Sequence, residues 1–496
     1  MHIQNLERLQ NHGNVQGRQQ VLEILEAGLQ AADPYYNTLR LIRIENGALL
    51  VGDPAFEPIG DPRAGVSRYP LDKLGRIFVF GAGKGIQQIA KGLEEALGDL
   101  LTGGHIILKH GDPDVLKKIS VTWGGHPIPD EHCVEGCRKI VSMIEEADLQ
   151  PEDLVFTIVG NGVSSLLTLP APGLSLESVK KVTRILQIEK GATTRDLNYI
   201  RNEIDQLKGG RITRLLRPAQ MVHLLSVDCN YGVTAFVGYR GLTEGNVWLH
   251  SLPDCTSKER AIQALHQLDA WDLMDKEVQD HLLNMTPEQE ALKKPEFEAM
   301  NCRIFGMMPD PLGVEPAVKK ECEEMGLPCH TVCKAHFLES AEAGKFTASI
   351  AKLIAAENQP FKAPCVLLIT GEKIVKVGAN GGVGGRNQEF CISAALQIAN
   401  QDRIVIASAD TDGTDGPGGY FCEEAKELGV AALAGGIVDG FTIREAEHRG
   451  VDLREALKTH ATSKALWDLD SGIWTSQNIS VQDIVVVLIQ EPTSHQ

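Results

Sequence analysis

Three glycine-rich stretches hold the charged residues that could do chemistry on an anion. The first, residues 81–85, reads Gly-Ala-Gly-Lys-Gly and follows an apolar run at 77–80. Backbone amides at a strand-to-helix turn bind anions, and Lys84 adds a mobile positive charge suited to phosphate or carboxylate. The stretch fits neither the P-loop pattern nor GxGxxG, so a purely structural tight turn is the alternative interpretation.

The second stretch, residues 378–388, ends in Arg386-Asn387-Gln388 ahead of a helical pattern. Its glycines let the backbone approach a bulky anion. Arg386 could bind phosphate oxygens through two hydrogen bonds and stabilise the charge that develops in phosphoryl transfer. The alternative is a flexible hairpin tip with a solvated arginine, which the polar cluster opening a helix disfavours.

The third stretch, residues 410–417, reads Asp-Thr-Asp-Gly-Thr-Asp-Gly-Pro, with three carboxylates in six residues. Such a set suits a hard cation such as magnesium. A turn built by aspartate side chains is the alternative, because such turns are common. His126, between Gly125 and Pro127, is interpreted as a residue that shapes a loop, with an acid–base role as the alternative.

Each of these stretches lies near a short apolar run that predicts a buried strand. Such runs alternate with helical patterns, which predicts an α/β fold with mostly parallel sheets flanked by helices and ligands at the carboxyl ends of the strands. The predicted strands lie at 77–80, 105–108, 154–159, 222–227, 301–310, 327–332, 365–370, 404–408 and 484–489. Helices are predicted at 257–268 and 286–294. A change in composition near 355–363 divides the chain into domains 15–355 and 360–492.

The composition narrows the range of partners. With 48 basic and 66 acidic residues among 496, the net charge is −18, which disfavours nucleic acid and an anionic membrane surface. No stretch approaches the ~20 apolar residues that span a bilayer, and the first twenty residues lack the apolar core of a signal peptide. Eleven scattered cysteines indicate reduced thiols, hence a cytoplasmic protein. The composition is compatible with a homo-oligomer.

Taken together and in this order, the motifs resemble the class II glycerate kinases. This family carries a C-terminal MOFRL domain and has often been labelled hydroxypyruvate reductase. The matching segments, which run from about residue 20 to 490 with a poor middle, are 31–34, 81–84, 125–131, 169–174, 208–211, 384–390 and 411–417.

The resemblance implies two α/β domains with the active site in the cleft between them. It implies that ATP and Mg²⁺ are used to phosphorylate a hydroxyl of glycerate or a related small hydroxy acid, typically giving 2-phosphoglycerate. It implies Lys84 and Arg386 as catalytic cations. The residues implied to bind the nucleotide are Gly81, Gly83, Gly162, Ser164, Gly384, Gly385 and Asn387, and those implied to bind the metal are Glu372, Asp412 and Asp415.

Some segments depart from the family pattern. Asn161 and Val163 stand where the family has glycine, Asp228 stands at a shifted position, and Asp483 comes two places late. An altered substrate or a non-catalytic ligand-binding relative is therefore the alternative. A nicotinamide-dependent hydroxypyruvate reductase is disfavoured, because no strand is followed by GxGxxG with an acidic residue about 20 positions further on.

Overall fold

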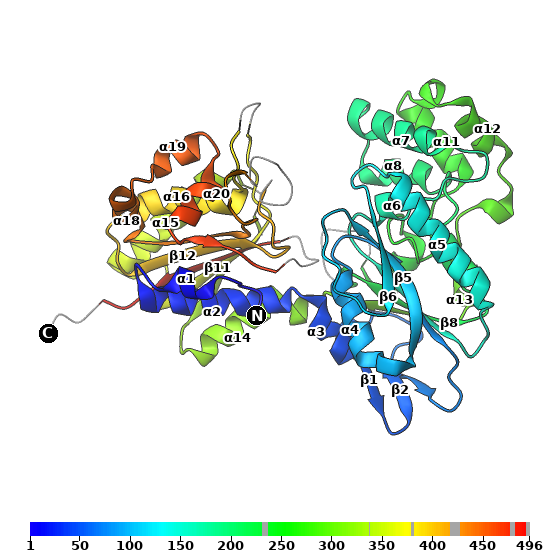
Figure 1. Cartoon of the computed structure of the whole chain (residues 1–496), viewed down its shortest axis with the longest axis horizontal. Helices are drawn as coiled ribbons and strands as arrows, with labels where there is room; N and C mark the ends of the chain where they lie inside the picture. The colour runs from blue at the N-terminus through cyan, green and yellow to red at the C-terminus, as the bar shows by residue number, and fades with distance from the viewer. Residues whose placement is uncertain (231–236, 337, 378–380, 417–426, 477–481, 493–496) are drawn as a thin grey trace. The chain divides into compact units, whose positions relative to one another are not determined.

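The computed structural model describes residues 1–230, 237–336, 338–377, 381–416, 427–476 and 482–492, and the chain folds into two units (Figure 1). One unit is residues 34–310, and the other combines residues 1–33 with residues 311–496. This division differs from the predicted domains, 15–355 and 360–492. The reason is that helices α2 (Val15–Ala31) and α14 (Val314–Glu324) pack against the C-terminal sheet. Both helices therefore belong to the unit that contains this sheet, although they come earlier in the chain.

The unit of residues 34–310 is built on a six-stranded sheet in which every neighbouring pair is parallel. Its strands, in spatial order, are β6 (Ile119–Gly124), β5 (Leu101–Lys109), β4 (Ile77–Ala82), β7 (Leu154–Val159), β8 (Gln220–Leu225) and β9 (Cys302–Gly306). Five of them contain or overlap predicted runs. The sixth, β6, was not predicted, because an edge strand with polar and exposed positions is not a continuous apolar run.

Helices and a small second sheet complete this unit. Helix α5 (Glu131–Ala147) packs on β5 and β6, and α4 (Gln87–Leu97) follows the turn after β4. A separate apolar core holds α7 (Leu176–Thr183), α8 (Thr194–Arg201), α11 (Lys258–Gln267) and α12 (Lys276–Asn284). An antiparallel sheet consists of β1 (Ile42–Glu45), β2 (Ala48–Val51) and β3 (Ser67–Pro70).

The two predicted helices in the middle of the chain have different outcomes. The one at 257–268 is confirmed as α11. The one at 286–294 is wrong, because residues Pro287–Gln289 form a single 3₁₀ turn and α13 (Lys294–Glu298) begins only afterwards. Thr286 and Gln289 close a capping box on that turn, and prolines open both short elements, which favours two short helical starts over one long helix.

The second unit has a six-stranded sheet in the order β10-β11-β15-β12-β13-β14. Its strands are β10 (Cys329–His336), β11 (Cys365–Gly371), β15 (Asp483–Ile489), β12 (Ile404–Asp410), β13 (Gly435–Asp439) and β14 (Gly472–Ile473). Among the described strands of this sheet, only β10 and β11 pair in parallel. The last strand, β15, inserts antiparallel between β11 and β12, so these two run in the same direction and end at the same edge.

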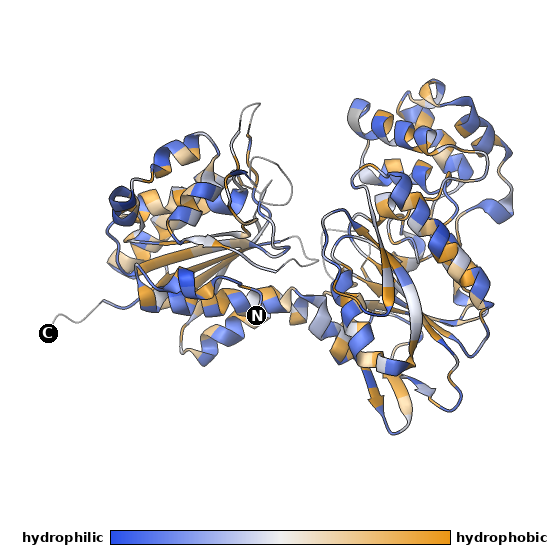
Figure 2. Cartoon of the chain, in the orientation of Figure 1, coloured by the Kyte–Doolittle hydropathy of each residue, from blue (hydrophilic) through white to orange (hydrophobic). Residues whose placement is uncertain are grey.

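Alternate side chains of this sheet enter two apolar layers. Those on one face pack with α2 and α14, and those on the other face pack with α15 (Ser340–Glu357) and α16 (Arg386–Ile398). Figure 2 shows the strands of both sheets mostly apolar and the helices striped with polar residues. The predicted α/β class is therefore confirmed. Among the described helices, none combines the length and apolarity needed to cross a bilayer.

Candidate active site

The turn after β4 packs directly against the turn after β7. The amide of Lys84 donates to the carbonyl oxygen of Asn161 at 2.7 Å. A Cβ on Gly83 would lie 2.5 Å from the Cα of Gly160, and a Cβ on Gly81 would lie 2.3 Å from the carbonyl oxygen of Ile158. These glycines let the two backbones touch, and the contact places Lys84 at the carboxyl edge of the sheet.

The turn after β7 brings Lys84 close to His126. Gly162 has a φ of +76°, and a Cβ there would lie 2.7 Å from the ring of His126 and 3.2 Å from the Cγ of Lys84. Gly162 is therefore required by both its backbone and its neighbours. Ser164 follows on the short helix α6 (Val163–Leu166), and its Oγ lies 2.9 Å from the Nε2 of His250.

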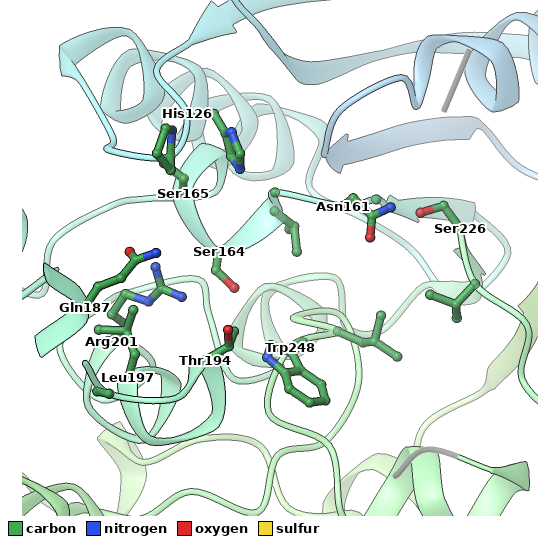
Figure 3. A pocket seen from close by; sticks show the side chains of 17 residues that line it. His126, Asn161, Ser164, Ser165, Gln187, Thr194, Leu197, Arg201, Ser226 and Trp248 are labelled. Atoms are coloured by element: carbon green, nitrogen blue, oxygen red, sulfur yellow. The ribbon is translucent and has the colours of Figure 1, made fainter. Parts of the chain in front are cut away.

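A cavity of about 460 Å³ opens beside these residues (Figure 3). Its polar side chains include His126, Asn161, Ser164, Thr194 and Arg201. Its apolar wall includes Val163, Leu197, Val227, Trp248 and Leu249. Predicted residues Gly162 and Ser164 thus line a ligand-sized cavity of this unit, in the volume range typical of small-molecule sites.

The cavity is electropositive although the whole chain is acidic. Burial, together with the nearby cations Lys84, Lys109 and Arg201, lowers the pKa of His126 to about 4, so this imidazole is neutral at pH 7. Burial also lowers the pKa of His250 well below its ordinary value. His126 and His250 therefore act here as neutral hydrogen-bonding groups, and the positive charge comes from lysine and arginine.

A second cluster forms around Arg386 at the edge of the other sheet. Its Nε donates to Asp483 Oδ1 at 3.0 Å, its Nη2 donates to Asp410 Oδ2 at 2.5 Å, and its Nη1 lies 3.7 Å from Glu372 Oε1. Burial alone would lower the pKa of Arg386, but the carboxylates of Asp410 and Asp483 outweigh it and raise this pKa above its usual range. The guanidinium is thus held in a fixed orientation with its charge intact.

The two carboxylates that hold Arg386 have opposite pKa shifts. Burial raises the pKa of Asp410 well above its ordinary value, and the nearby charge of Asp412 adds to this. Burial acts on Asp483 as well, but the cations of Lys373 and Arg386 outweigh it and lower the pKa of Asp483. The nearby cations therefore stabilise the ionised form of Asp483, whereas for Asp410 they do not offset the effect of burial.

Asp415 caps helix α16, and Gly384 and Gly385 pack around this cap. Its Oδ1 and Oδ2 accept from the backbone amides of Asn387 and Gln388 at 3.0 and 2.9 Å, so the side chain caps the first turn of α16. A Cβ on Gly385 would lie 2.2 Å from the carbonyl oxygen of Asp415, and one on Gly384 would lie 2.4 Å from the carbonyl oxygen of His460. Packing around this cap accounts for both glycines.

The structure thus gathers the predicted residues in two groups. Lys84, Gly162 and Ser164 meet in residues 34–310, whereas Glu372, Arg386 and Asn387 meet in the other unit, where Asn387 Nδ2 donates to Asp483 at 2.6 Å. Asp412 is half-buried and accepts from the amide of Thr414 at 2.8 Å. Of the motifs, residues 378–380, 417 and 477–481 lie outside the described residues.

Asp410 was one of the three carboxylates of the third stretch, but it was not among the residues expected to bind the metal. Asp483 and Arg201 were not among the predicted site residues. Asp410 ends β12 and Asp483 begins β15, and only the strand register shows that they lie opposite each other. Arg201 ends α8 and enters the cavity without any motif around it.

Comparisons with known proteins agree with this architecture. Residues 20–283 match the family described as "Domain of unknown function (DUF4147)", and residues 365–480 match the MOFRL family. The glycerate 2-kinase of Pyrococcus horikoshii is 28% identical over 94% of this chain and 96% of its own. The D-glycerate 2-kinase of Thermotoga maritima is 29% identical over 89% of this chain and 97% of its own.

A putative hydroxypyruvate reductase of Agrobacterium vitis is 28% identical over 84% of this chain and 100% of its own. The crystal structure of a glycerate kinase from Thermotoga maritima superposes with a TM-score of 0.71 and 26% identity, covering 95% of this chain and 99% of that chain. The resemblance to the glycerate 2-kinases that the motifs indicated is confirmed, and because the first match spans more than half of its residues, the chain belongs to the DUF4147 family, with a MOFRL domain following.

Proposed function

We propose that this protein is a kinase that transfers the terminal phosphoryl group of ATP to a hydroxyl of glycerate or a related small hydroxy acid, giving 2-phosphoglycerate from glycerate. Relatives named glycerate 2-kinase, which match 94% and 89% of the chain, support a kinase that acts on glycerate. The observation that supports the proposal is the pair Lys84 and Arg386, because each lies at the carboxyl end of strands of its own sheet, where α/β sheets usually bind ligands.

In this proposal the two cations act on the same phosphoryl group. Lys84 neutralises phosphate oxygens next to the turn at 160–164, as lysines do in other phosphate sites. Arg386, oriented by Asp410 and Asp483, stabilises the charge that spreads over the equatorial oxygens in the transition state.

Magnesium would neutralise the phosphates of ATP and orient the terminal group. Asp410 and Asp412 are the first candidates for this ion, since both offer carboxylate oxygens, and burial together with the charge of Asp412 raises the pKa of Asp410, which a bound cation would oppose. Glu372, with a half-exposed side chain beside Arg386, is the third candidate ligand. Asp415 fits less well, because backbone amides already occupy both of its oxygens.

A coupled assay of ADP release tests the proposal. We expect ADP to form with ATP, Mg²⁺ and D-glycerate or another C3 or C4 hydroxy acid, and no oxidation of NADH or NADPH with hydroxypyruvate. ADP formation only with another acid would indicate an altered substrate, for which Val163 in the cavity wall is the candidate cause. Calorimetric binding of nucleotide or acid without any ADP formation would overturn the proposal in favour of a non-catalytic relative.

A further inference from the structure

Arg201 is a buried cation for which the described residues supply no carboxylate partner. The residue is 8% exposed, and its Nε and Nη2 donate to the amide oxygen of Asn198 at 3.0 and 2.5 Å. Within the described part of the chain, no carboxylate oxygen lies within 4.0 Å of the guanidinium. A buried charge without a counter-charge is costly, so a functional reason for it is expected.

The other cations buried to a similar degree are paired. Arg18 lies 2.6 Å from Asp439, Lys208 lies 2.6 Å from Asp205, and the same relation holds for Arg211 with Glu203, Arg303 with Glu57 and Lys373 with Asp483. Burial lowers the pKa of Arg201 to about 10, with only a partial offset from the more distant Asp205. This side chain therefore differs from the structural arginines and lysines of the same protein.

The guanidinium of Arg201 enters the cavity. Figure 3 shows it beside Gln187 and directed toward Ser164 and the open space. Because both hydrogen bonds to Asn198 use the Nε side of the fork, the remaining N–H groups of Nη1 and Nη2 are left to meet a ligand. A pair of parallel N–H groups matches the two oxygens of a carboxylate.

Asn198 connects this arginine to Ser164. Its amide Nδ2 lies 3.5 Å from Ser164 Oγ and donates to the carbonyl oxygen of Val247 at 3.0 Å, while its Oδ1 accepts from Arg201. Ser164 Oγ also contacts the neutral ring of His250. The cavity thus presents a fixed cation for an acid group and a hydroxyl beside it that can hydrogen-bond a substrate hydroxyl.

We propose that Arg201 binds the carboxylate of the hydroxy acid acceptor, with Asn198 as the residue that positions both Arg201 and Ser164. The identity of this ligand as the acceptor rests on the proposed kinase function. In this arrangement Lys84 serves the phosphate and Arg201 serves the acid, so charge recognition of the two substrates is divided between two separate cations of the same unit. Uncharged polyols are excluded because they leave the guanidinium unpaired.

Calorimetry without nucleotide tests the assignment in the intact protein. We expect D-glycerate to bind wild type on the order of 30-fold or more tightly than glyceramide, its uncharged amide, because the loss of a buried charge partner is costly. Arg201→Gln should weaken D-glycerate binding to a similar degree and raise KM for the acid while KM for ATP is unchanged. Arg195→Gln, which removes a cation stacked on Trp248 at 5.6 Å from the same helix, is the control and should bind like wild type.

Thermal unfolding separates a binding role from a structural one. Because Arg201 lacks a counter-charge, Arg201→Gln should melt no lower than wild type, whereas a structural arginine would cost stability when replaced. Equal binding of D-glycerate and glyceramide to wild type, or unchanged D-glycerate binding by the variant, overturns the inference. Weakened ATP binding with unchanged acid binding overturns it as well and assigns the arginine to the nucleotide. Arg201-dependent acid binding without any ADP formation would leave the site standing and reject the kinase.

Discussion

The Nε of Arg386 donates to the buried carboxylate of Asp483 across 3.0 Å, although 97 residues separate them in the chain. Asp483 begins the last strand, which inserts between two strands that end at the same sheet edge. A second cation, Lys373, lies 3.0 Å from the same carboxylate. The final strand of the chain therefore supplies the charge that fixes the orientation of the proposed catalytic arginine.

Asp483→Asn should destabilise the unit that contains it. The change removes the negative charge that Arg386 and Lys373 share, and breaking a buried pair costs about 3–5 kcal/mol. Urea unfolding followed by circular dichroism measures this loss. Asp468→Asn, which breaks an exposed pair with Lys464, is the control and should cost less than about 1 kcal/mol. Equal stabilities of the two variants would contradict the structural role of Asp483.

Lys84→Ala should reduce kcat of the proposed kinase on the order of a thousandfold and leave the fold intact. The lysine supplies charge to the transferred group, whereas its backbone amide, which contacts Asn161, is retained in alanine. Steady-state kinetics and a melting curve measure the two effects. The control is Lys91→Ala. Lys91 is an exposed cation of helix α4 that lies over the ring of Tyr35, and this variant should keep the kcat of wild type. A kcat within a few-fold of wild type in Lys84→Ala would remove this residue from the chemistry.

Gly83→Ala should cost several kcal/mol of unfolding free energy, because the φ of +155° at Gly83 disfavours a side chain and a Cβ would lie 2.5 Å from the Cα of Gly160. Gly98 is a matched control: its φ of +51° also favours glycine, but a Cβ there meets open space. Gly98→Ala should cost only about 1–3 kcal/mol, the backbone part of the penalty. Urea midpoints of the two variants separate backbone strain from the clash, and equal losses would argue against the close approach of the two turns.

Most of the central strands could be predicted from the sequence, because strands buried on both faces are continuous apolar runs, a pattern that exposed elements do not have. The strand β13 was not predicted, since its two glycines give it little apolar side chain, and a Cβ on Gly435 would lie 1.9 Å from the carbonyl oxygen of Ser408. The division into units was not predictable from composition, because α2 joins a sheet whose first strand begins about 300 residues later.

Only those candidate site residues that lie in sequence motifs could be predicted. The motifs made Lys84 and Arg386 candidates for the site, but they could not tell a metal ligand from a helix cap at Asp415, since both uses need a carboxylate in a glycine-rich turn. Arg201 has no motif at all. What distinguishes it is the absence of a carboxylate partner among the described residues, and that is a property of the three-dimensional surroundings.

The buried His2 should make stability depend on pH, because its Nε2 lies 2.9 Å from Asp33 and its Nδ1 lies 3.3 Å from Glu26. Burial alone would lower the pKa of His2, but its two acidic partners outweigh burial and raise this pKa to about 9. The unfolded value is about 6.5. The stabilisation is therefore fully present below about pH 6.5 and is lost as the pH rises through 9.

Between pH 6.5 and 9.5, we expect the unfolding free energy of wild type to fall by about 3 kcal/mol from this group. His2→Gln keeps a polar side chain but cannot carry the charge, so its unfolding free energy should be lower at pH 6.5 and nearly flat over this range. The pKa of Glu26, lowered to about 2, adds a second window, in which stability is lost as the pH falls from about 4.5. Urea titrations at several pH values measure both windows. His448→Gln, at an exposed helix position, should follow the wild-type curve, and a His2→Gln curve parallel to wild type would show that His2 is not ionised in the folded protein.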